Sequence, residues 1–316
     1  MSAETTLAHA HGAPLTGAEA EAATVKREVR NRWFLLSPAM LIICGIGIMP
    51  LAIIIGYSFM EQGNYAGVKW EFTLESWMNL ITERDIFDDT LGWNHAHISI
   101  MLRSIGLALM TMVTTLIMGF PTAYFITTRP EGQRNFWLFL IALPFFSNLL
   151  VRTFSMMLML RDDGYINNVL LFLGVIDEPM ILIYTNTAVA IGLVFTYLPL
   201  MVMPLYASME KLNFNLVEAG YDLYASRFQV LKRVILPSVK PGIIAGCILV
   251  FIPAIGAYVT AKILGGGKNL MIGNLIANQF GTSRDWPLGS AISLFMMIVV
   301  MIALIVYVRN SLAEQD

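Results

Sequence analysis

Long charge-free apolar runs recur along the chain, and each is close to the length that crosses a bilayer. A spanning helix needs about 20 predominantly apolar residues. Six windows meet this requirement, at residues 33–60, 104–128, 135–160, 180–209, 241–261 and 286–308. The third window contains one charge, Arg152, which we interpret as a snorkelling or loop-anchoring residue. The pattern therefore predicts six transmembrane helices.

The composition supports a membrane protein. Of the 316 residues, 57% are hydrophobic and only 13% are charged, whereas soluble domains carry about 25% charged residues. Little hydrophobic sequence is left over outside the six windows, which excludes a large soluble domain. A net charge of −2 provides no basic surface for nucleic acid. We predict an all-α polytopic membrane protein that has no nucleic-acid partner.

Positive charges are unevenly distributed between the two sets of loops. Of the 20 Lys and Arg residues, 12 lie in both terminal segments and in the loops that follow spans two and four, whereas the opposite side has seven. The positive-inside rule then places both termini in the cytoplasm. We expect a cytoplasmic tail at 1–32 (disordered over about 1–25, which lacks an apolar run), a membrane domain at 33–310 and a cytoplasmic end at 311–316.

The predicted cytoplasmic loop at 211–240 has apolar residues at roughly helical spacing. Asn215 is a plausible N-cap, with Glu218 three residues later as in a capping box. We predict a short helix, a turn and a second helix that ends before Pro237. The loop is too polar to span a membrane and too apolar to be left bare, and a plain connector could be far shorter. These features indicate a docking element.

This loop resembles the EAA loop of binding-protein-dependent ABC importer permeases. The match rests on Glu218, Ala219, Gly220, Asp222, Leu223, Ala225, Ser226, Phe228, Ile235, Leu236 and Pro237. Two positions depart from the family pattern: Gly220 replaces the second Ala, and Tyr224 replaces a Gly at the turn between the two helices. A non-Gly residue resists the positive φ expected at such a turn. We call residues 211–240 the EAA-like loop.

The resemblance implies that this loop docks in a groove of an ATPase subunit. Glu218 would make polar contacts there, and Ala219, Gly220 and Ala225 would allow close approach. Tyr224 and Phe228 would supply apolar contact. Asp222, Leu236 and Pro237 complete the matched motif.

Other segments resemble polyamine-type permeases of the same family. They lie at 150–153, 160–164, 197–199, 203–206, 251–254, 264–266, 271–273 and 284–287. Within the family, the similarity is nearest to the spermidine/putrescine permease of the first subunit type, over about 33–309. It implies a type I importer permease (MetI-like) fold in the bacterial inner membrane. It also implies a pore shared with a second homologous permease, two ATP-binding subunits and a periplasmic solute-binding protein.

Candidate cofactor and metal motifs are weak. The segment 265–269 departs from a P-loop, because Lys262 and Asn269 stand where a Gly and a Ser or Thr are required. His95 and His97 are too few ligands for a metal site, and no catalytic cluster falls in the spans. We expect a non-catalytic subunit that binds no cofactor, and the resemblance implies that a separate ATPase uses ATP and Mg²⁺.

A polyamine path needs carboxylates or aromatic faces that attract ammonium groups. No Asp or Glu lies deep in a predicted span. Asp162 and Asp163 are candidates at the predicted outer mouth, and Tyr197, Phe251 and Tyr258 are aromatic candidates. A solvated loop or ordinary helix packing remains an alternative for each of them.

Three other functions remain to be weighed. An importer of the same class could carry another small solute. A secondary transporter would require paired titratable residues near the midplane and an inverted repeat, and neither is visible. A membrane enzyme is disfavoured because the sequence shows no catalytic cluster.

Overall fold

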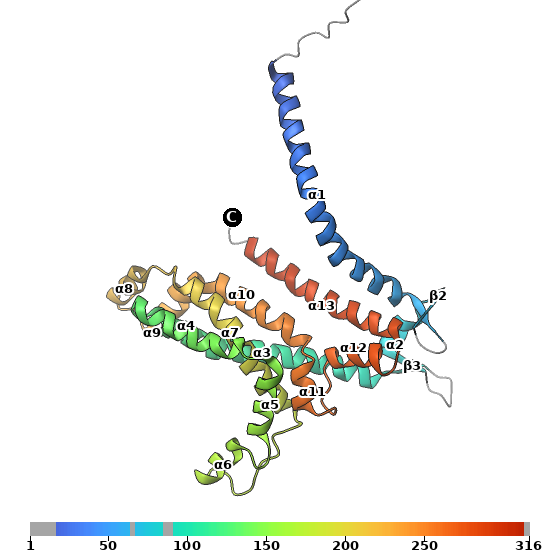
Figure 1. The fold of residues 1–316 in the computed structure, drawn as a ribbon. Helices are drawn as coiled ribbons and strands as arrows, with labels where there is room; N and C mark the ends of the chain where they lie inside the picture. The colour runs from blue at the N-terminus through green and yellow to red at the C-terminus, as the bar shows by residue number, and fades with distance from the viewer. Residues whose placement is uncertain (1–16, 64–66, 85–90, 313–316) are drawn as a thin grey trace, which may run out of the picture. The chain divides into compact units, whose positions relative to one another are not determined.

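The computed structural model describes residues 17–63, 67–84 and 91–312, and the chain divides into two units, 1–53 and 54–316 (Figure 1). The helices are α1 (Gly17–Ser58), α2 (Glu75–Ile81), α3 (His95–Thr127), α4 (Glu131–Phe146), α5 (Leu149–Leu160), α6 (Tyr165–Phe172), α7 (Asn186–Met209), α8 (Phe214–Asp222), α9 (Arg227–Val230), α10 (Leu236–Ile255), α11 (Val259–Gly265), α12 (Ile272–Gly281) and α13 (Trp286–Leu312), with a π-helical turn η1 (Leu231–Ile235) between α9 and α10. The strands are β1 (Met60–Gln62), β2 (Val68–Phe72), β3 (Thr82–Arg84) and β4 (Leu91–Trp93).

Within the described ranges, five helices are long and apolar enough to cross a membrane. They are Leu35–Ser58, His95–Thr127, Asn186–Met209, Arg227–Ile255 and Trp286–Ile305. A sixth span arises if α4 and the helical segment Leu149–Phe172 count together, although they are bent by 92°. The expected segments are therefore present, and the third differs from the expectation of one helix over 135–160.

The break in the third span has a local cause. The backbone N–H of Ser147 donates to the Pro144 carbonyl and closes α4, and Ser147 itself is extended. Asn148 then starts α5, because its Oδ1 accepts the N–H of Leu150 at 2.8 Å. A helix stop and a new N-cap thus follow each other directly, which a hydrophobicity pattern does not register.

The ends of two other spans also differ from the sequence expectation. The fourth begins at Asn186 rather than near 180, because the Thr185 hydroxyl caps the N–H of Ala188. The first helix begins at Gly17, so residues 17–25 are helical where we expected disorder. Their Ala and Glu content favours a helix. Residues 1–16 and 313–316 of the two predicted tails lie outside the described residues.

The core of the second unit lies where α3, α7 and α10 pack together (Figure 1). Met201 of α7 is fully buried and fills the space beside a glycine on each neighbour. A Cβ added at Gly119 of α3 would lie 3.0 Å from Met201 Cγ, and one at Gly246 of α10 would lie 2.7 Å from Met201 Sδ. Small residues permit such close helix packing in a membrane.

Two short antiparallel hairpins supplement the predicted all-α fold. The strands β1 and β2 form one, and β3 and β4 form the other. The β1–β2 hairpin follows α1 directly, with Met60 opposite Phe72 and Glu61 opposite Lys69. The sequence pattern did not predict either hairpin.

Candidate functional site

The first helix of the EAA-like loop starts two residues earlier than expected. Its N-cap is Asn213, whose Oδ1 accepts the N–H of Asn215 at 3.1 Å. The expected capping box of Asn215 with Glu218 was therefore wrong. Glu218 lies in the second turn of α8 and its side chain is exposed to solvent.

The turn after α8 is a Schellman motif built around Tyr224. The Ala225 N–H donates to the Gly220 carbonyl and the Tyr224 N–H donates to the Tyr221 carbonyl, which is the hydrogen-bond pattern of that motif. Tyr224 has φ +58°. The turn therefore keeps the left-handed geometry for which glycine is favoured, although a non-Gly residue costs roughly 1–2 kcal/mol there.

The second helix of the loop continues into the fifth span instead of ending before Pro237. Ser226 caps α9 in a full capping box with Gln229. The π-helical turn η1 follows, and α10 begins at Leu236 with Pro237 in its first turn. Proline is accommodated there because the π-helical turn directly before it already departs from the α-helical hydrogen-bond pattern. The stop expected at Pro237 is therefore wrong.

One face of the EAA-like loop is buried in the protein core. Val217 and Val230 are 5% and 1% exposed, and both belong to the cluster that includes Leu205 and Met209 of α7. A Cβ at Gly220 would lie 3.3 Å from Val230 Cγ2. Gly220 therefore allows α8 to approach the loop's own second helix closely, and Ala225 also packs against this core.

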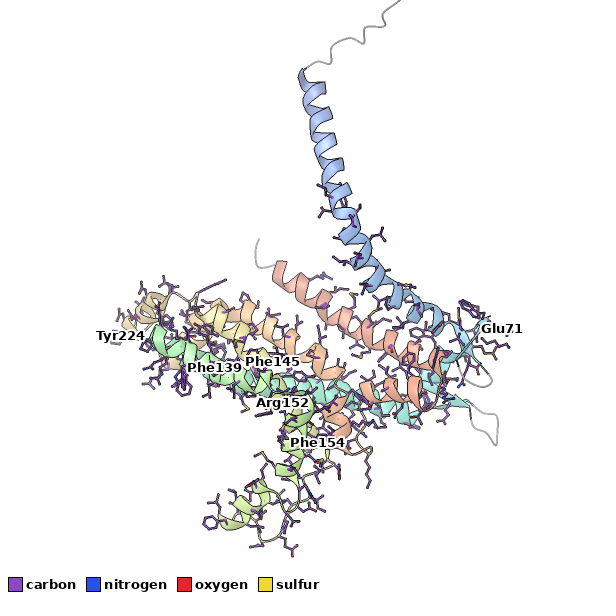
Figure 2. The ribbon with its side chains drawn as sticks, viewed as in Figure 1. Glu71, Phe139, Phe145, Arg152, Phe154 and Tyr224 are labelled. Carbon is purple, nitrogen blue, oxygen red and sulfur yellow. The ribbon has the colours of Figure 1, made fainter. Side chains whose placement is uncertain are left out.

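The opposite face of the loop is exposed. Tyr224 is 98% exposed at the tip of the loop (Figure 2), and Phe228 is 70% exposed. Glu218, Ala219, Asp222, Leu236 and Pro237 are exposed as well. The loop thus presents carboxylates and large apolar side chains on its exposed face, while its buried face packs against α7.

A second candidate region is a cavity of about 300 Å³, which we call the acidic cavity. It is lined by Met157, Arg161, Asp162, Asp163, Ile183 and Tyr184. The Asn167 side chain fixes the carboxylate segment, because its Nδ2 donates to the Asp162 carbonyl at 3.2 Å and to the Met180 carbonyl at 2.9 Å. Tyr184 has φ +60° and was not found from the sequence, because it is about 20 residues from the carboxylates.

The three aromatic candidates do not line the acidic cavity. Tyr197 donates its hydroxyl to the Pro253 carbonyl at 3.1 Å, and Phe251 packs against a core cluster formed with α13. Tyr258 is 37% exposed. The Lys262 ammonium lies 5.2 Å from its ring centroid and donates to its hydroxyl at 2.8 Å. The structure thus places the predicted path residues at separate positions.

Arg152 holds the break in the third span (Figure 2). Its side chain is only 8% exposed, and Nη1 donates to the Pro144 carbonyl at 2.7 Å, near the last turn of α4. The same carbonyl accepts the N–H of Ser147 and the Ser147 hydroxyl, the latter at 2.7 Å, so three donors converge on the end of α4. Arg152 therefore anchors the break, and the alternative of a snorkelling side chain is wrong.

No metal site emerges from the described part of the chain. Within it, no group of three or more His, Cys, Asp or Glu side chains is placed to hold a metal ion. The EAA-like loop and the acidic cavity both present exposed carboxylates and aromatic rings.

Comparison with known proteins decides the family. The family described as "Binding-protein-dependent transport system inner membrane component" matches residues 109–314. The chain belongs to this family. The EAA-like loop lies within the matched region, as do the broken third span and the acidic cavity.

Relatives of this transport component cover most of the chain. It is 42% identical to the spermidine/putrescine transport system permease protein PotB of Salmonella typhimurium, over 83% of this chain and 88% of that protein. It is 43% identical to PotB of Escherichia coli, over 83% and 91%. The permease of a bacterial alginate ABC transporter has the same fold, with a TM-score of 0.67 at 14% identity over 90% of this chain and 99% of that one.

Proposed function

We propose that this chain is the non-catalytic permease subunit of an ATP-driven importer of putrescine and spermidine. It would form half of the translocation pore. The observation that carries the proposal is the 42–43% identity to PotB permeases over most of both chains. An importer of the same class for another small solute is the alternative.

The other half of the pore would be a second homologous permease. Two ATP-binding subunits would bind and hydrolyse ATP with Mg²⁺, and a periplasmic binding protein would deliver the polyamine. The two-faced EAA-like loop supports this arrangement. A displacement of the exposed side chains Glu218, Tyr224 or Phe228 would be transmitted to α7, because packed interiors transmit displacement. The connection runs through buried Val217 and Val230.

The substrate path would begin at the acidic cavity and continue along aromatic side chains. Asp162 and Asp163 would attract the polyamine, and Tyr184 offers a ring beside them. Tyr258 would contribute its hydroxyl oxygen, which in this structure accepts a hydrogen bond from the Lys262 ammonium at 2.8 Å. Tyr197 and Phe251 would line the deeper path.

The chain would cross the bacterial inner membrane with both termini in the cytoplasm. The excess of Lys and Arg in the terminal segments and in the loops after spans two and four supports this orientation. It places the EAA-like loop on the side where ATP is available, and it places the acidic cavity on the periplasmic side.

The test is purification of the tagged chain from its own cells in mild detergent, followed by mass spectrometry of the accompanying proteins. We expect a P-loop ATPase and a second six-span permease. The accompanying binding protein, titrated with both polyamines, then identifies the solute. A chain that purifies alone and moves polyamine in liposomes without ATP would contradict the proposal and favour a secondary transporter.

A further inference from the structure

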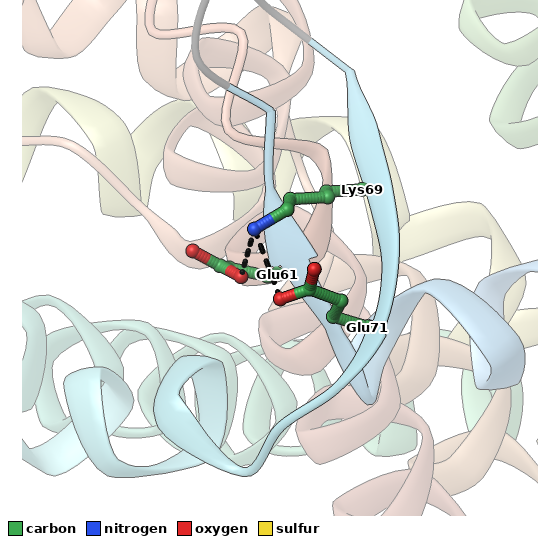
Figure 3. Close-up of polar contacts among 3 residues, drawn as sticks. All are labelled: Glu61, Lys69 and Glu71. Carbon is green, nitrogen blue, oxygen red and sulfur yellow. Dashed lines mark hydrogen bonds and ion pairs between the residues drawn. The ribbon is translucent and has the colours of Figure 1, made fainter.

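The β1–β2 hairpin has one charged face. The Lys69 ammonium lies 3.2 Å from Glu61 Oε2 and 2.9 Å from Glu71 Oε2, so Figure 3 shows it between the two carboxylates. Hydrogen bonds to Glu71 and Glu61 raise the pKa of Lys69, and the bond to Lys69 lowers the pKa of Glu71. Lys69 and Glu71 are therefore charged at neutral pH.

The other face of the hairpin is apolar and aromatic. Side chains alternate between the two faces of a strand, so Val68, Trp70 and Phe72 lie opposite Lys69 and Glu71. Trp70 is 82% exposed and Phe72 is 81% exposed. Phe72 has Phe59 stacked on one side at 5.7 Å. Two large aromatic side chains are thus left uncovered on a single face.

Only part of the charged face is turned toward the protein, since the side chains of Lys69 and Glu71 are 47% and 61% exposed. Glu61 lines a polar cavity of about 180 Å³ together with Gln62, Thr73, Glu75, Ser76, Asn79 and Asp285. A hairpin in water places its apolar face inward and its polar face outward. The aromatic side chains of this hairpin are more exposed than its charged triad, which is expected where part of the surroundings is apolar.

The hairpin also lies at the level where two spans end. Tyr57, one residue before the end of the first candidate span, stacks on Trp286, the first residue of the last one, with ring centroids 6.2 Å apart. Tyr and Trp concentrate at the membrane–water interface. The strand β1 begins at Met60, two residues after Ser58, so its start lies within about 7 Å of the end of the first span along the chain.

We infer that the β1–β2 hairpin inserts Trp70 and Phe72 into the interfacial layer of the bilayer, at the end of the protein opposite the EAA-like loop. Glu61 of the charged triad lines the protein's polar cavity. The lipid interface is the expected occupant because Trp and Phe both partition there and the hairpin is at interfacial height. This inference does not depend on the transported solute.

The test measures which face of β2 meets lipid. Cys44 and Cys247 are replaced by Ser, and a nitroxide is attached at Trp70→Cys or, as the matched control on the opposite face, at Glu71→Cys. The complex that purifies with the chain is placed in nanodiscs of phosphatidylethanolamine and phosphatidylglycerol. Collision rates with oxygen, which concentrates in lipid, are compared with those of a water-soluble nickel chelate.

We expect position 70 to favour oxygen and position 71 to favour the nickel chelate. Equal access of the nickel chelate to both positions would overturn the inference, and so would protection of position 70 from both reagents, which indicates a covering protein.

A second measurement avoids the label. Lipids brominated near the headgroup should quench a fraction of the tryptophan fluorescence of the unlabelled protein, and Trp70→Phe should reduce that fraction. An unchanged quenched fraction would contradict lipid contact.

Discussion

The EAA-like loop and the acidic cavity are built in opposite ways. The caps and turn of the loop are set by residues within 213–235, and its buried face packs against the helix that directly precedes it, α7. The acidic cavity needs Asp162 and Asp163 from one segment and Tyr184 from another, and Asn167 holds the first segment in place. A contiguous site is readable from spacing, whereas a cavity assembled from two separate segments is not.

The strongest challenge to this comparison is charge reversal on the exposed face of the loop. Glu218→Lys should lower uptake and uptake-linked ATP hydrolysis by about tenfold or more, since placing a wrong charge in an interface costs several kcal/mol. Uptake of labelled polyamine by membrane vesicles measures the loss. Glu131→Lys, an exposed reversal at the start of α4, is the control and should change uptake little. Normal uptake in Glu218→Lys would remove the docking role.

The next largest effect concerns the break in the third span. Arg152→Met removes the charged one of the three donors to the Pro144 carbonyl, which should destabilise the protein by about 1.5–3 kcal/mol. Thermal unfolding in detergent measures this as a lower Tm. Arg152→Lys retains one charged donor, so its Tm should lie between those of the parent protein and Arg152→Met. If Arg152→Met unfolds at the parent temperature, the anchoring role is wrong.

A smaller effect is expected from the cavity's charge. Asp162→Asn combined with Asp163→Asn should raise the KM for spermidine about three- to tenfold and that for putrescine less, because spermidine has more positive charge. The difference should shrink in high salt. Asp177→Asn combined with Glu178→Gln removes an exposed acidic pair outside the cavity lining and serves as the control. Identical KM shifts in the two double variants would show that the acidic cavity is not part of the substrate path.

The smallest effect tests the turn of the loop. Tyr224→Gly should stabilise the protein by up to about 1 kcal/mol, because glycine adopts a positive φ without a Cβ clash. Leu223→Gly, one residue earlier at φ −82°, should instead destabilise it by about 0.5–1 kcal/mol. Denaturant or thermal unfolding separates the two. Destabilisation by both variants would show that Tyr224 is not strained.

The sequence predicted the six apolar segments and the EAA-like loop because both signals are local. It also contains the capping box of Ser226 and Gln229, which starts the second helix of the loop, in readable form. The prediction favoured a cap only for the first helix, at Asn215. The break at Ser147 could not be predicted, since it depends on which carbonyl accepts one N–H. The position of Tyr184 depends on distant partners, including Asn269, whose Nδ2 hydrogen bonds to the Tyr184 carbonyl.

The most direct test of the whole account is spermidine uptake by proteoliposomes that contain the purified complex. Uptake should require ATP on the side of the membrane that the EAA-like loop faces, and the solute-binding protein on the opposite side. Glu218→Lys should abolish this uptake. Uptake that proceeds without ATP, or without the binding protein, would contradict the claim that this chain is the permease subunit of an ATP-driven importer.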